Sequence, residues 1–62
     1  MQKLSRLKYS RQKRMLTQEE LARAAEVSRS TIAALEMGDR KAYPSTARKL
    51  AKVLKVRPED LV

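Results

Sequence analysis

The side chains of this sequence that could do chemistry are mainly cationic. Fifteen lysines and arginines stand against seven aspartates and glutamates, which gives a net charge of +8 on 62 residues. A positive charge this dense attracts polyanions, so it suits a nucleic acid or an anionic membrane surface. Charge alone does not separate DNA, RNA and lipid, and a merely solubilising surface has a similar composition.

Catalytic and metal-binding chemistry has little support in this composition. The chain has no cysteine and no histidine, which removes the thiolate, the commonest metal ligand and the commonest general base. Glu19 and Glu20 are adjacent acids, but no base or metal ligand stands beside them in the sequence. We therefore expect no enzyme activity, no catalytic residue and no bound metal or cofactor.

The sequence has no segment typical of export or of membrane insertion. The N-terminus is basic, but it lacks the apolar run of a signal peptide. No stretch approaches the roughly 18 apolar residues that a membrane span requires. These patterns predict a cytoplasmic protein with no membrane partner.

Most of the basic residues fall into three groups along the chain. The first 18 residues hold no acid, a basic pair follows the middle of the chain, and a third group lies near the C-terminus. The groups are Lys3, Arg6, Lys8, Arg11, Lys13 and Arg14; then Arg40 and Lys41; then Arg48, Lys49, Lys52, Lys55 and Arg57.

The elements that must position these cations are predicted to be all helical. Helix-forming residues dominate, and no stretch alternates apolar and polar residues for long enough to indicate a strand. We predict an all-α fold of five helices, without strand pairing, in a single domain over residues 1–62. The expected helices span residues 2–13, 17–25, 28–36, 45–54 and 58–61. The side chains expected to be largely buried are Leu21, Val27, Ile32, Leu35, Leu50 and Leu54.

Local signals mark several helix ends. Thr17 and Glu20 have the spacing of a capping box, in which each side chain satisfies a free backbone N–H of the other residue. Ser28 and Ser45 are expected to cap the helices that follow them. Gly38 is expected to end helix 28–36 in the left-handed conformation.

Helices 17–25 and 28–36 are joined by a very short turn, so they must pack closely. Ala22 permits the close approach, and apolar side chains fill the angle between the helices. The outward side of helix 28–36 lacks bulky apolar groups and carries Arg29, Ser30, Ala33 and Ala34. A helix with such a face can enter the major groove of B-DNA, which is about 12 Å wide.

This pattern resembles the helix-turn-helix of the phage repressor and Cro family. The resemblance rests on Leu16–Ala22, Ala25, Val27, Ser28, Ser30–Ile32, Leu35, Glu36 and Gly38, and it continues in Leu50, Ala51, Leu54, Val56 and Leu61. It covers nearly the whole chain. It implies a five-helix, lambda-repressor-like DNA-binding domain with helix 28–36 as the recognition helix in the major groove.

The resemblance also implies contacts to DNA. Arg29 and Ser30 would reach base edges, and Ala33 and Ala34 would face the bases one turn further along, where they could contact thymine methyl groups. The backbone phosphates would be contacted by Gln18, with Thr17 beside it, and by Arg40 and Lys41.

Other matching positions bear on structure. Arg11 and Glu36 stand where the family often has a partly buried ion pair. Glu26 and Lys55 stand where it usually has glycine, which predicts local strain because the position after helix 17–25 often needs a positive φ. Met37 stands where the family often has a polar phosphate contact, so no such role is assigned to it.

The function implied is sequence-specific binding of double-stranded DNA and regulation of transcription, with repression expected. One copy reads few base pairs, so a homodimer on a palindromic operator is expected. Two alternatives use the same fold: the antitoxin of a toxin–antitoxin pair, which would also bind its toxin, and a module that docks another protein. A basic RNA-binding protein is a third alternative, although the few aromatic residues argue against recognition of single strands.

Overall fold

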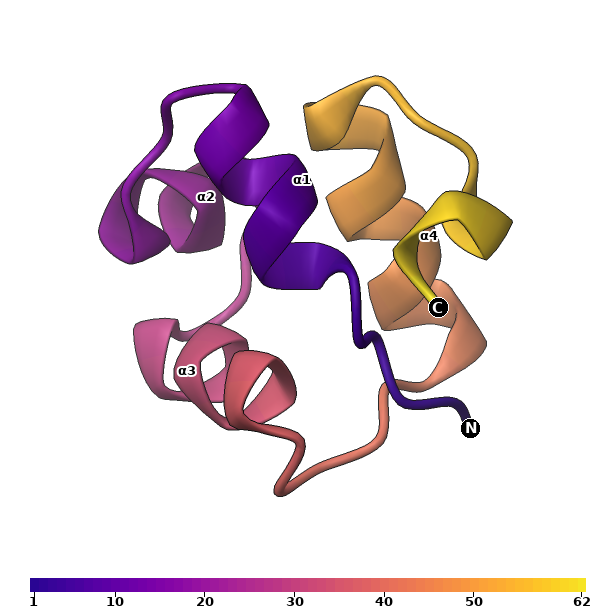
Figure 1. Cartoon of the computed structure of the whole chain (residues 1–62). Helices are drawn as coiled ribbons and strands as arrows, with labels where there is room; N and C mark the ends of the chain where they lie inside the picture. Colours follow the sequence, from indigo (N-terminus) through magenta and orange to yellow (C-terminus); the bar gives the residue numbers. More distant parts are fainter.

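The computed structural model describes residues 1–62 as an all-α fold of four α-helices and one 3-10 helix. In chain order these are α1 (Leu7–Lys13), α2 (Gln18–Ala25), α3 (Arg29–Met37), α4 (Pro44–Leu54) and the 3-10 helix η1 (Pro58–Leu61). In Figure 1, α1 lies at the centre, α2 and α3 lie on one side of it, and α4 lies on the other. The fifth predicted helix is therefore a single 3-10 turn rather than an α-helix. None of the helices is long and apolar enough to span a membrane.

One hydrophobic core of 13 buried residues holds the helices together. Five of the six side chains expected to be largely buried lie in it, and Ile32 is completely inaccessible to solvent. Val27 is the exception, because it is only half-buried and packs against the edge of the core. The core residues are Leu4, Leu7, Leu21, Ala22, Ala25, Ile32, Leu35, Ala42, Ala47, Leu50, Ala51, Leu54 and Leu61.

The caps at α2 and α3 are those that the sequence predicts. The hydroxyl of Thr17 accepts from the backbone N–H of Glu20 at 3.0 Å, and the Glu20 carboxylate accepts from the N–H of Thr17 at 2.8 Å. Ser28 caps α3, and Gly38 ends it with φ 81°. Each of these signals lies within about one helical turn of the end that it marks, so it needs no tertiary context.

The predicted start of α4 is wrong by one position. The helix begins at Pro44, and Tyr43 is its N-cap without a side-chain hydrogen bond, so Ser45 does not cap it. Proline suits the first position of a helix because its φ is already helical and no N–H is needed there.

The predicted first helix is also wrong over its first five residues. Gln2 is extended and forms an isolated antiparallel bridge with Ala42, whereas helix 2–13 was expected without any strand pairing. The reason is that the free backbone groups find partners far along the chain. Gln2 and Ala42 exchange two main-chain hydrogen bonds, of 3.1 and 2.7 Å, and the N–H of Arg6 donates to the carbonyl of Leu61 at 2.9 Å.

The turn between α2 and α3 depends on a left-handed residue. Glu26 has φ 60° and ψ 42°, and Lys55 adopts nearly the same conformation after α4. Met15 is a third non-glycine residue with positive φ, which the sequence did not predict. This conformation lets the chain reverse within two residues, but it is strained for a side chain that carries Cβ.

We predict that Glu26→Gly stabilises the protein by up to about 1 kcal/mol, because glycine removes the Cβ strain at positive φ. In a domain of this size, urea or thermal unfolding resolves such a change as a rise in Tm of about 4–8 °C per kcal/mol. Ala24→Gly is the matched control in the same helix, and it should destabilise by about 1 kcal/mol, since Ala24 is an exposed residue of α2 with ordinary helical geometry. Destabilisation by Glu26→Gly would show that the turn is unstrained.

Candidate nucleic-acid interface

The N-terminal end of α3 is an organised group of hydroxyls. Ser28 accepts from the N–H of Thr31 at 3.1 Å, and its oxygen lies 2.7 Å from that of Thr31 and 3.2 Å from that of Ser30. Ser28 and Ser30 are exposed and Thr31 is half-buried. The first turn of α3 therefore presents polar groups whose positions are already set by the cap.

The outward face of α3 is less open than the sequence predicts. Arg29 and Ser30 are exposed, and Arg29 forms no ion pair. Ala33 and Ala34, expected to point outward, are half-buried. Met37 ends the same helix and is 74% exposed. The accessible chemistry of α3 is thus a guanidinium and a hydroxyl at its start, followed by small apolar side chains and one large one.

A cation from the following loop lies against α3. The guanidinium of Arg40 donates to the hydroxyl of Thr31 at 3.4 Å. Lys41, the next residue, is exposed and forms no ion pair. The tertiary structure therefore places Arg40, one of the predicted phosphate contacts, beside the first turn of the predicted recognition helix. The sequence gave no signal for the Arg40–Thr31 contact, because the two residues are nine positions apart and separated by a turn.

Gln18 does not lie on a free surface. It is half-buried, and its side-chain amide donates to the carboxylate of Glu36 at 3.0 Å. Thr17 beside it is exposed, but its oxygen and its N–H are both used in the capping box. The N–H of Glu20 is taken by the Thr17 hydroxyl, but the N–H groups of Gln18 and Glu19 have no partner inside the helix, so a phosphate can be met there by main chain as well as by side chains.

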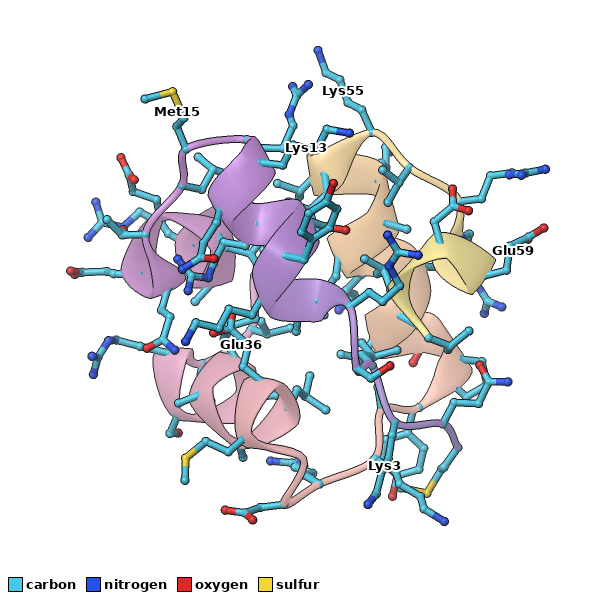
Figure 2. The ribbon with its side chains drawn as sticks, viewed as in Figure 1. Lys3, Lys13, Met15, Glu36, Lys55 and Glu59 are labelled. Atoms are coloured by element: carbon cyan, nitrogen blue, oxygen red, sulfur yellow. The ribbon has the colours of Figure 1, made fainter.

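Glu36 is the centre of a buried polar network. Two nitrogens of Arg11 donate to its carboxylate: Nε lies 2.6 Å from Oε2, and Nη2 lies 3.1 Å from Oε1. The third nitrogen of Arg11 donates to the carbonyl of Leu16 at 2.7 Å. The side chain of Glu36 is 3% exposed and that of Arg11 is 11% exposed. Figure 2 shows Glu36 pointing from α3 into the space beneath α1.

The network settles the charge state of Glu36. Burial by itself would raise the pKa of this carboxyl, because removal from water disfavours the charged form. The hydrogen bonds from Arg11 and Gln18, together with the positive charges of Arg11 and Lys8, outweigh burial and leave the pKa below its ordinary value of 4.5. Glu36 is therefore ionised at neutral pH. It joins α3, on which it lies, to α1 and to the start of α2.

Other clusters of polar residues do not form a competing site of this kind. No three acidic side chains come together in a way that could hold a metal ion. A hollow of about 540 Å³ lies between α1 and η1, lined by both charges and by an exposed tyrosine. Its lining contains no residue of α2 or α3, so it is separate from the surface that carries Arg29 and Arg40.

A family model described as helix-turn-helix matches residues 7–61, which is nearly the whole chain. A search of the curated proteins finds no match.

We predict that Glu36→Ala lowers the free energy of unfolding by about 3–5 kcal/mol, because Arg11 is left as a buried charge without its partner. Glu19→Ala is the matched control. It removes a carboxylate that pairs with Arg23 at 3.2 Å on the exposed face of α2, and it should cost under about 1 kcal/mol. Urea unfolding at neutral pH measures the change in unfolding free energy for each variant. Equal losses would show that the buried Arg11–Glu36 pair stabilises the protein no more than the exposed pair does.

The same carboxyl predicts a pH dependence. Because its pKa is lower in the folded state, ionised Glu36 contributes stability above about pH 4.5, and this contribution is lost as the pH falls through the folded-state pKa. We expect the difference in unfolding free energy between the natural protein and Glu36→Gln to stay constant from pH 7 to about pH 5 and to narrow below that. Glu20, whose pKa is also lowered, is present in both proteins and cancels. If the difference in unfolding free energy instead widens as the pH falls, the pKa of Glu36 is not lowered by the fold.

Proposed function

Because the chain belongs to the Cro-type helix-turn-helix family, whose members bind DNA and regulate transcription, we propose that it recognises a specific duplex sequence through α3. The observation that carries this proposal is the start of α3. Arg29 and Ser30 are exposed there, beside Arg40, on a helix that is fixed to the fold by the buried carboxylate of Glu36.

Arg29 is the residue proposed to read sequence directly. A guanidinium can donate two hydrogen bonds to O6 and N7 of guanine, which no other base pair accepts in the same way. Ser30 adds a weaker and less selective hydrogen bond. Ala33 and Ala34 allow a close approach and offer methyl groups to thymine, although their partial burial leaves them less area for contact than a fully exposed face would.

The phosphate contacts are proposed to flank α3 on both sides. Arg40 and Lys41 supply cations on the loop side, and the start of α2 supplies main-chain N–H groups with the side chains of Gln18 and Thr17. Gln18 has a second amide hydrogen beyond the one that it gives to Glu36, so it can bind a phosphate without leaving the network. Such contacts fix the orientation of α3 and carry no sequence information.

The assembly on DNA is proposed to be a homodimer on a palindromic operator, with residues 1–62 acting as one DNA-binding unit. At 1.5 Å per residue, α3 is about 13 Å long, so one copy covers only a few base pairs. Repression would follow from occupying a site that polymerase needs. A toxin or other protein partner stays a prediction, and co-purification from the native host tests for it.

Selection of bound sequences from a random duplex pool tests the proposal as a whole. A two-fold symmetric motif with a guanine at a fixed place in each half is the expected result. Enrichment of no motif would leave the protein a general binder of duplex DNA.

We predict that Arg29→Ala weakens binding to the selected sequence by about 1–3 kcal/mol and changes binding to random duplex little. Lys41→Gln should weaken both duplexes alike and lower the slope of log K against log salt by about one unit, because one fewer counterion is released. Salt titrations of both variants on both duplexes make the comparison. Equal losses on the two duplexes for Arg29→Ala would remove Arg29 from base reading.

A further inference from the structure

The N-terminal segment and the loop between α3 and α4 form one small extended unit. Gln2 and Ala42 exchange both main-chain hydrogen bonds, from N–H to O at 3.1 Å and at 2.7 Å, in an antiparallel bridge. Figure 1 shows the N-terminus lying against the chain just before α4. Residues 1–3 are therefore neighbours of the loop that carries Arg40 and Lys41.

The bridge at Gln2 and Ala42 is a single pair, and no further main-chain hydrogen bond continues it. In the antiparallel direction the next positions are Lys3 and Lys41, and this direction puts their side chains on one side of the two segments. Ala42 is buried, and side chains alternate along an extended chain, so Lys41 and Lys3 project away from the core. Both are exposed and neither forms an ion pair.

Two like charges placed opposite each other across an antiparallel pair are destabilising. Here no carboxylate compensates them, so the free protein carries an unrelieved repulsion at this edge. An anion between the two amines would relieve it. We propose that Lys3 and Lys41 together bind the sugar–phosphate backbone of duplex DNA, so that the N-terminal segment is part of the interface; this rests on the proposed function.

The backbone around Lys3 is held in place before any ligand arrives. On one side is the bridge at Gln2, and on the other Leu4 is buried in the core, with its carbonyl accepting from the N–H of Leu7 at 3.1 Å. Binding therefore orders only the lysine side chain, which keeps the entropic cost low.

The pair lies at the correct edge of the molecule for this role. Arg40, adjacent to Lys41, reaches Thr31 in the first turn of α3. In Figure 2, Lys3 lies at the lower edge, on the side of the loop that follows α3, whereas Lys55 projects from the opposite edge. A phosphate held by Lys3 and Lys41 would thus border the groove that α3 enters.

The first test uses the full chain with Lys3→Gln, and with Lys55→Gln as the matched control of equal charge change. Lys3→Gln should weaken binding to selected and random duplex alike, by about five- to tenfold at 0.1 M salt, and lower the salt slope by about 0.9. Lys55→Gln should change the slope much less. Unchanged binding by Lys3→Gln while Lys41→Gln weakens binding would overturn the pair and leave the proposed function standing. If the natural protein binds no duplex at all, both the lysine pair and the proposed function are overturned.

A second test needs no DNA. In low salt, Lys3→Gln and Lys41→Gln should each raise Tm by about 1–4 °C more than Lys55→Gln does, and the gain should fade in high salt. Once one of the two lysines is replaced, replacing the other should add little, because the repulsion is already gone. Additive gains, or none beyond those of Lys55→Gln, would show that the two amines are not juxtaposed and would overturn the proposal.

Discussion

The buried carboxylate of Glu36 is the interaction on which the arrangement of this protein depends. It receives two hydrogen bonds from Arg11 and one from Gln18, and Arg11 also donates to the carbonyl of Leu16. A buried charge of this kind is tolerated only when its partners are complete, and no buried side-chain polar atom in the structure lacks a hydrogen bond. The network therefore specifies how α3 sits against α1 and the start of α2, which apolar packing alone would specify less sharply.

Because of this network, the cationic residues of the protein are of two kinds. Arg11 lies inside the fold and balances Glu36, so it is not available to a ligand. The other arginines and all the lysines lie on the surface, where only Arg23 and Arg57 have acidic partners, and these pairs are exposed. The free cations therefore leave the surface strongly positive, while Arg11 holds α3 in place through Glu36.

Short turns determine how close the helices that carry these groups can come. Glu26 and Lys55 accept the left-handed conformation at some cost in strain. The turn at Glu26 leaves room for only one further residue before Ser28, whose cap then sets the hydroxyls of the first turn of α3. A longer turn would relax the strain, but it would also release the start of α3 from its position beside α2.

The sequence by itself determined those features whose causes are local. The helix-forming composition predicted the all-α fold, and five of the six side chains expected to be buried lie in the core. The Thr17–Glu20 spacing predicted the capping box of α2, and Ser28 by its residue type predicted the cap of α3. The pairing of Arg11 with Glu36 came from the likeness to a known family rather than from any local rule. Only the tertiary structure decided that Gln2 pairs with Ala42, that Gln18 joins Glu36, and that Arg40 reaches Thr31. Each of these contacts joins residues separated by a turn or by most of the chain, and whether they meet depends on how the helices pack, which no short window of sequence contains.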